Sequence, residues 1–137
     1  MLKRYGRVLN VASIAAFQPI ASLATCAATK AYVLSLTESL AEELKGSGVT
    51  VTALCPGITA TQMMATAQQD SPGLKLPDFL IGDAAQVAAD GFDACMRGDV
   101  IKVSGAVNLA TTLASRATPK WLIRRISGAL GRITVRN

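Results

Sequence analysis

The fold of this chain is decided by residues 49–57, which read VTVTALCPG. The run from Val49 to Leu54 is short and rich in β-branched side chains, and Cys55-Pro56-Gly57 closes it with a turn. A similar apolar run, Val8 to Ala12, ends at Ser13. Short apolar runs of this kind predict strands that are buried on both faces of a parallel sheet.

The segment between these two runs favours a helix from about Leu23 to Lys45. One face of this helix is predicted to be apolar and another acidic. The apolar positions are Ala27, Ala31, Leu34 and Ala41, and the acidic ones are Glu38, Glu42 and Glu43. Gly46 and Gly48 predict where the helix ends. A strand, a helix and a strand in this order form a βαβ unit, so we expect parallel strands joined by a right-handed crossover.

The rest of the chain continues the alternation of helices and strands. Asp83 predicts the N-cap of a helix that runs to about Met96, with an apolar side made of Ala84, Val87, Ala88, Gly91 and Phe92. A third strand is expected over residues 100–103 and a helix over residues 106–115. Pro119 opens an amphipathic helix whose apolar stripe consists of Leu122, Ile126, Leu130 and Ile133. The predicted fold is therefore α/β, with three parallel strands and flanking helices.

The charge of the chain is concentrated at its C-terminal end. The 137 residues are enough for one domain, and the net charge is +5. Residues 116–137 contain six basic side chains and no acid, whereas residues 1–115 contain eight basic and nine acidic ones. We therefore expect a nearly neutral domain over residues 1–115 and a basic amphipathic helix over residues 116–137. A neutral domain with few aromatic side chains argues against a nucleic-acid partner.

The cysteines and the apolar runs indicate the compartment. Cys26, Cys55 and Cys95 form no Cys-x-x-Cys pair, and the chain has no histidine. This argues against a disulfide framework or a zinc site and suits a reducing compartment. No apolar run is long enough to span a bilayer, and no signal peptide is recognisable, so we expect a cytoplasmic protein without a bound metal.

Polar residues gather where the predicted strands end. Ser13 follows the first strand and Pro56-Gly57 follows the second, while Cys26 and Lys30 lie one turn apart on one face of the helix between them. Ligands of parallel α/β sheets bind outside the carboxyl ends of the strands. Each residue alone is explained as well by a strand end, a solvated lysine or a turn. Together, in this order, they predict a ligand site at that edge.

The segments GRVLNVAS (residues 6–13), CAATK (26–30) and PGITAT (56–61) resemble the C-terminal half of a short-chain dehydrogenase/reductase. The resemblance extends from Arg7 to about Gly105. It implies the C-terminal portion of a doubly wound, Rossmann-like sheet, with NAD or NADP as the cofactor. It also implies an oxidoreductase activity on a carbonyl/hydroxyl pair.

The same resemblance implies roles for individual residues. Ser13 matches the serine that polarises the substrate oxygen, and Lys30 matches the lysine that binds the nicotinamide ribose and lowers the pKa of the catalytic tyrosine. Pro56-Gly57 matches the loop beside the nicotinamide. Thr61 matches a threonine that often bonds the carboxamide, with the backbone of Thr59 as a companion contact. Thr61 is equally suited to be the N-cap of a helix.

Cys26 stands where the family has the proton-donating tyrosine. A thiol ends one bond beyond Cβ and falls short of the place that a phenol oxygen reaches, so we expect impaired proton transfer. A nucleophilic or redox role for Cys26 is disfavoured, because no histidine is present to act as its base. The glycine-rich phosphate loop of the family is also missing from the sequence, which predicts a fragment or a truncated chain.

Two functions follow from these patterns. The first is a truncated and impaired NAD(P)-dependent oxidoreductase, whose variable segment 65–81 favours a small apolar carbonyl or alcohol substrate. The apolar residues near this segment are Met63, Met64, Leu76, Phe79 and Leu80. The second is a non-catalytic remnant or a homo-oligomerisation module that uses Leu34, Leu36 and Leu40. The basic C-terminal helix could contact an anionic membrane surface, although a helix that covers the sheet or a subunit is favoured.

Overall fold

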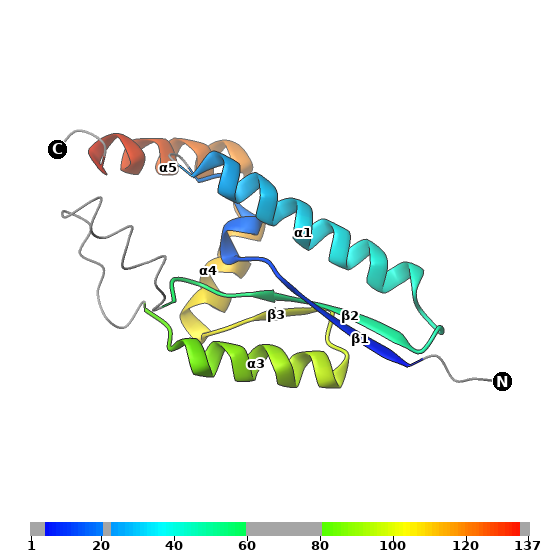
Figure 1. Ribbon diagram of the computed structural model, residues 1–137. Coiled ribbons are helices and arrows are strands. Elements are labelled where there is room, and N and C mark those ends of the chain that lie inside the picture. Colours follow the sequence, from blue (N-terminus) through cyan, green and yellow to red (C-terminus); the bar gives the residue numbers. More distant parts are fainter. Residues whose placement is uncertain (1–4, 21–22, 60–80, 135–137) are drawn as a thin grey trace.

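A computed structural model describes residues 5–20, 23–59 and 81–134 of the chain (Figure 1). The elements in chain order are β1 (Gly6–Val11), the 3₁₀ helix η1 (Ile14–Phe17), α1 (Ala24–Glu43), β2 (Val49–Cys55), α3 (Ala84–Arg97), β3 (Ile101–Val103), α4 (Ala106–Ala117) and α5 (Lys120–Thr134). Strands and helices alternate as the sequence predicts. The 3₁₀ helix η1 lies in a segment where the sequence predicted no helix.

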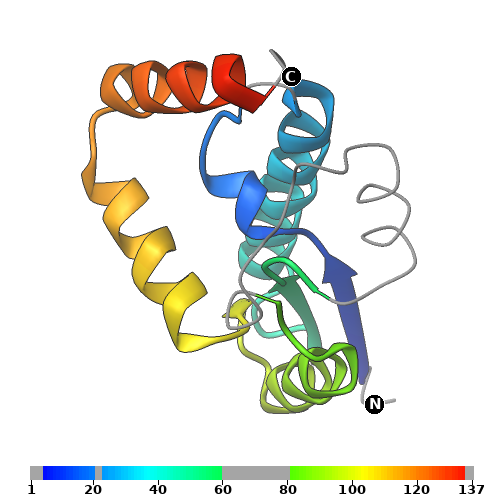
Figure 2. The ribbon, with the colours of Figure 1, turned by 90° about the vertical axis from the view of Figure 1, so that its left-hand side faces the viewer.

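The described strands form one parallel sheet in the order β1-β2-β3. Val8 lies opposite Val51, and Ala53 lies opposite Ile101. Helix α1 covers one face of the sheet and α3 covers the other, as the two views in Figure 1 and Figure 2 show. The predicted α/β fold with three parallel strands is confirmed. In both views α5 runs past the N-terminal end of α1.

The main core lies between α1 and the sheet. It contains Ala12, Leu34, Ala53 and Cys55, against which Phe17, Val33, Ile101 and Val103 pack. On the opposite face of the sheet, α3 approaches β2 at Gly91. A Cβ at Gly91 would lie 2.6 Å from Cδ2 of Leu54, so this close approach requires a residue without a side chain.

The turn between α1 and β2 depends on glycine. Gly46 and Gly48 have φ angles of 78° and 86°, which side chains with a Cβ rarely adopt. They end α1 close to the predicted place and lead the chain into β2, so the two stop signals in the sequence are confirmed.

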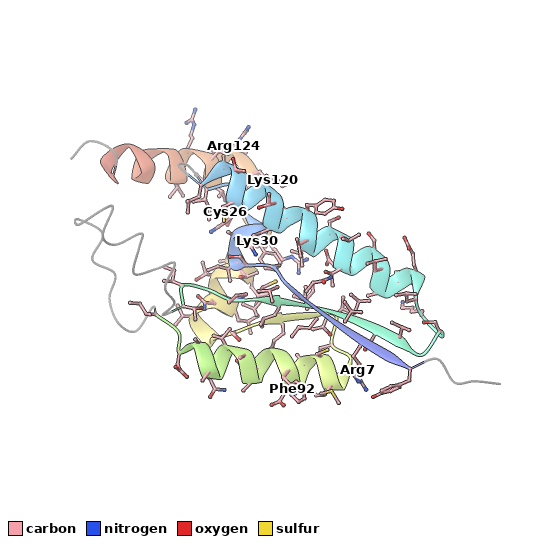
Figure 3. All side chains as sticks on the ribbon, viewed as in Figure 1. Arg7, Cys26, Lys30, Phe92, Lys120 and Arg124 are labelled. Atoms are coloured by element: carbon pink, nitrogen blue, oxygen red, sulfur yellow. The ribbon has the colours of Figure 1, made fainter. Side chains whose placement is uncertain are left out.

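Two expectations about burial are wrong. Val8, Leu9 and Val11 of β1 are exposed, because β1 lies at the edge of the described sheet and no described strand pairs with its outer side. Phe92 is 62% exposed and points away from the sheet (Figure 3). Gly91 of the predicted apolar side is buried, and Ala94 and Cys95 are buried beside it, since the helix packs through its glycine.

Leu34 does not belong to a surface for a second chain. It is 6% exposed and is part of the core between α1 and the sheet. Its helical neighbours Leu36 and Leu40 are exposed and half-buried, respectively. Within the described part of the chain, no helix combines the length and the apolar character that a membrane crossing requires.

Candidate functional site

The ends of β1 and β2 are joined by hydrogen bonds that continue beyond the strands. The backbone amide of Ala12 donates to the carbonyl oxygen of Leu54 at 2.8 Å, and that of Ile14 donates to the carbonyl oxygen of Pro56 at 3.0 Å. The segment around Ser13 and the Pro56–Gly57 loop are therefore held side by side at the carboxyl edge of the sheet. This is the arrangement that a parallel βαβ unit dictates.

Ser13 is the N-cap of η1. Its extended backbone lets the side-chain Oγ accept a hydrogen bond from the backbone amide of Ala15 at 3.1 Å. Among the described residues, its hydroxyl proton has no acceptor. The cap therefore ties the Ser13 side chain to the start of η1.

Lys30 reaches from α1 to the end of β1. Its side chain is half-buried, and its Nζ donates to the carbonyl oxygen of Val11 at 3.0 Å. Figure 3 shows Cys26 and Lys30 one turn apart on the side of α1 that faces η1. The ammonium group therefore lies near the segment that carries Ser13.

Cys26 is exposed in the first turn of α1. Together with Leu23, Ala24 and Thr25 it lines an open hollow of about 440 Å³. The other cysteines differ, because Cys55 and Cys95 are both buried. Burial raises the pKa of the Cys55 thiol to about 11, and a hydrogen bond from the Ser13 backbone opposes this rise only in part.

The loop after β2 is braced by two hydrogen bonds. The Thr59 hydroxyl donates to the carbonyl oxygen of Gly57 at 3.2 Å, and the amide of Gly82 donates to the carbonyl oxygen of Ile58 at 2.8 Å. Thr61 lies outside the described residues. The same holds for the apolar residues assigned to the substrate segment, which are Met63, Met64, Leu76, Phe79 and Leu80.

Asn108 on α4 also belongs to this edge, and sequence reasoning missed it. Its side chain packs directly against Gly57, and its Nδ2 donates to the carbonyl oxygen of Ser104 at 2.7 Å. The Ser104 hydroxyl in turn donates to Asp90 Oδ2 at 2.9 Å. This hydrogen bond is the main cause that lowers the pKa of the Asp90 carboxyl. An asparagine near the start of a helix carries no signal that it contacts a loop fifty positions away.

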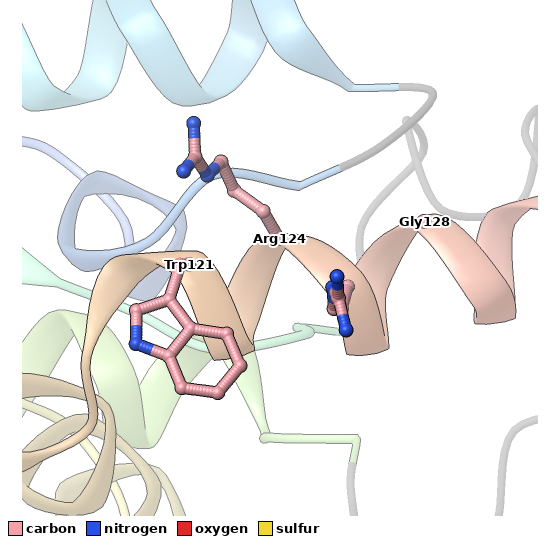
Figure 4. A pocket seen from close by; sticks show the side chains of 4 residues that line it. Trp121, Arg124 and Gly128 are labelled. Atoms are coloured by element: carbon pink, nitrogen blue, oxygen red, sulfur yellow. The ribbon is translucent and has the colours of Figure 1, made fainter.

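A second hollow lies on α5, away from the sheet edge (Figure 4). It is open, has a volume of about 620 Å³, and is lined by Trp121, Arg124, Arg125 and Gly128. The Arg125 guanidinium lies 6.0 Å from the centroid of the Trp121 ring. Ile126 of the predicted apolar stripe is exposed and Leu122 is half-buried. Contact of this helix with a membrane surface stays a prediction.

The residues at this edge lie in a segment that matches a known protein family. The family model for short chain dehydrogenases matches residues 1–72, which include Ser13, Cys26, Lys30 and Pro56-Gly57. The chain belongs to the short-chain dehydrogenase family. The predicted resemblance is thereby confirmed, and the parallel sheet with helices on both faces is the family's fold.

A curated relative of this short-chain dehydrogenase is the diacetyl reductase ((S)-acetoin forming) of Staphylococcus epidermidis. The two sequences are 36% identical over 114 residues, which cover 82% of this chain and 42% of the relative. The chain therefore spans less than half the length of that relative.

Two solved structures have a similar fold. A short chain dehydrogenase from Burkholderia cenocepacia in complex with NADP superimposes with a TM-score of 0.69 and 24% identity, over 90% of this chain and 47% of the other. A short chain dehydrogenase from Mycobacterium paratuberculosis bound to NAD has a TM-score of 0.55 and 20% identity, over 74% of this chain and 44% of the other. At these identities the likeness concerns the fold.

Proposed function

We propose that this chain forms the substrate-facing part of an NAD(P)-dependent oxidoreductase that acts on a small carbonyl/hydroxyl pair. One observation carries the proposal: Ser13, Lys30 and the Pro56–Gly57 loop share one edge of the sheet, tied together by the Lys30–Val11 and Ile14–Pro56 hydrogen bonds. The name of the staphylococcal diacetyl reductase and the NADP and NAD in the two related structures support the same chemistry.

The residues at this edge fit the nicotinamide end of such a cofactor. The Lys30 ammonium has three N–H groups, of which the carbonyl oxygen of Val11 accepts one, so the others can bond ribose hydroxyls. We assign Pro56-Gly57 and the backbone of Thr59 to the nicotinamide ring and its carboxamide, together with Thr61, which lies outside the described residues. When bound, the nicotinamide supplies or takes up a hydride.

Ser13 would hold the substrate oxygen. Its Oγ accepts the bond from the Ala15 amide, and the hydroxyl proton can turn about the C–O bond to donate to a carbonyl oxygen and polarise it. Cys26 would occupy the proton-donor position. Its thiol is too short to replace a phenol, and a misplacement of about 1 Å already costs ~10²-fold in rate. We therefore propose that proton transfer is the impaired step.

Cofactor binding tests this proposal. The full chain is titrated with NADPH and NADH while the fluorescence of the reduced nicotinamide is followed. We expect Lys30→Met to weaken binding at least about ten-fold, the value of one charge-assisted hydrogen bond. Lys45→Met is the matched control, because Lys45 is exposed beyond the other end of α1 and pairs only with Glu42 among the described residues. Absence of binding by the unchanged chain would refute the nicotinamide assignment.

A non-catalytic association module is the second candidate. The solvent face of α1 exposes Tyr32 and Leu36, with exposed fractions of 68% and 39%. Apolar side chains in this position favour contact with a second copy of the chain. Sedimentation equilibrium distinguishes the candidates: this one requires association that Tyr32→Ser with Leu36→Ser abolishes, in a chain that binds neither NADPH nor NADH.

A further inference from the structure

Asn108 lies in the first turns of α4, and its side-chain amide packs onto the backbone of Gly57. We infer that Asn108 is a positioning residue, which holds in place the Pro56–Gly57 loop that the proposed function assigns to the nicotinamide. The inference rests on the proposed function, because this loop is the one assigned to the nicotinamide. Asn108 acts through Gly57 and is not assigned to the reacting atoms.

Gly57 is glycine for reasons of space. A Cβ built at Gly57 would lie 2.5 Å from Oδ1 and 2.6 Å from Cγ of Asn108, closer than real Cβ atoms come to other atoms. The φ angle of Gly57 is not positive, unlike those of Gly46, Gly48 and Gly105, so the backbone conformation does not demand glycine here. The demand comes from the Asn108 side chain, which occupies the volume that a methyl group would need.

Asn108 is itself held from its other side. Its Nδ2 donates to the carbonyl oxygen of Ser104 at 2.7 Å, and this partner settles which end of the amide carries the nitrogen. Gly105 has a φ angle of 87°, and a Cβ there would lie 3.1 Å from the same Nδ2. The amide is therefore clamped between Gly57 and the Ser104–Gly105 turn.

The turn that holds Asn108 is anchored in the protein. Ser104 is 3% exposed, and its hydroxyl donates to Asp90 Oδ2 at 2.9 Å. Asp90 also accepts a hydrogen bond from Gln86 Nε2 at 3.2 Å. The loop after β2 is thus connected through Asn108 and Ser104 to helix α3. Bonds to a carboxylate are stronger than those between neutral groups, so this anchor is rigid.

Hydrogen exchange of the full chain tests the clamp without any ligand. We expect Asn108→Ala to speed exchange of the amides of Ile14 and Gly82 about ten-fold. These amides donate to the carbonyl oxygens of Pro56 and Ile58 on either side of Gly57, and both bonds open more often when the loop loses its packing against Asn108. Thr111→Ala is the matched control. It removes a hydrogen bond from a side chain to the backbone four residues earlier on the exposed side of the same helix, and it leaves Gly57 untouched.

Rescue separates positioning from a general loss of stability. Binding of reduced nicotinamide mononucleotide is measured for Gly57→Ala, for Asn108→Gly and for the double variant. Gly57→Ala should weaken binding about ten-fold or more, as expected for an overpacked contact that moves the loop. The double variant should regain most of the affinity, since Asn108→Gly removes the atoms that the new methyl group meets. If each substitution only destabilised the protein in general, the losses of affinity of the two single variants would add in the double variant.

The outcomes distinguish this inference from the proposed function. Unchanged exchange at Ile14 and Gly82 in Asn108→Ala, or a double variant no better than Gly57→Ala in exchange and in binding, overturns the inference. If the unchanged chain does not bind the mononucleotide, the proposed function fails, and the exchange of the Ile14 and Gly82 amides in the same variants still decides the clamp. Should Asn108→Ala not fold, Asn108→Asp keeps the shape but loses the donor to Ser104, and faster exchange at Ile14 and Gly82 is expected there too.

Discussion

The backbone amide of Ile14 donates to the carbonyl oxygen of Pro56 at 3.0 Å, so the residue after Ser13 is bonded directly to the Pro-Gly loop. This bond continues the ladder between β1 and β2 beyond the last strand residues. Because it joins two backbones, the relative position of Ser13 and the loop does not depend on side-chain rotamers. The backbone therefore sets the relative placement of these two segments before any ligand binds.

Ser13 has two roles that substitution can separate. Ser13→Ala removes the N-cap of η1 and should lower the free energy of unfolding by about 1 kcal/mol, measured by urea titration. Ser13→Asn keeps a side-chain oxygen that can accept from the Ala15 amide, so its stability should be close to that of the unchanged chain. Under the proposed function both variants lose reduction of a small diketone by NADPH. A rate for Ser13→Asn equal to that of the unchanged chain would contradict the role of the hydroxyl.

Replacing Cys26 should restore a proton donor. Cys26→Tyr is expected to raise the rate of diketone reduction by roughly 10²-fold, because the phenol reaches the oxygen that the thiol cannot reach. Cys26→Phe is the control, since it has the same ring without the hydroxyl. Cys26 is exposed, so both substitutions should fold. Equal rates for the Tyr and Phe variants would show that the position does not transfer a proton.

The buried thiol of Cys55 predicts an alkaline weakening of the fold. Its pKa is raised from 9.0 to about 11, so the folded state holds the proton more tightly than the unfolded state. The stabilisation is complete below pH 9 and is lost as the pH rises through about 11. A shift of this size corresponds to about 2–3 kcal/mol.

Cys55→Val tests this pH dependence, because it keeps an apolar side chain without an ionisable group. The free energy of unfolding is measured by urea titration between pH 8 and pH 11, as a difference between the variant and the unchanged chain. We expect the difference to shrink or reverse with rising pH. A constant difference would mean that ionisation of Cys55 is not linked to unfolding.

Gly91 allows α3 to contact β2, and filling it should destabilise the fold. Gly91→Ala places a methyl group 2.6 Å from Cδ2 of Leu54, which predicts a loss of about 1–3 kcal/mol. Leu54→Ala in the same chain removes the colliding atoms, so the two losses should not add. Ala88→Gly is the control, because Ala88 is exposed and lies one turn earlier in α3. It measures how much an Ala–Gly exchange alone changes the free energy of unfolding in this helix. Additive losses in the double variant would exclude a direct collision.

Much of the fold follows from local patterns in the sequence. The apolar runs at Val8–Ala12 and Val49–Leu54, the helix between them and its glycine stop signals depend on backbone geometry and on neighbours within a few residues. Once these elements form a parallel βαβ unit, Ser13 and Pro56-Gly57 must lie at the same edge of the sheet. The position of Lys30 beside that edge follows from the same topology.

Which faces are buried, and which distant residues meet, depended on the tertiary structure. Phe92 fits an apolar helix face in the sequence, yet α3 packs through Gly91 and turns Phe92 to solvent. Asn108 contacts Gly57 only because α4 returns to the end of β2. By itself the sequence determined the elements and their order, since these depend on local hydrogen bonds and periodicity. Only the tertiary structure decided the packing partners, since these depend on how closely separate elements approach one another.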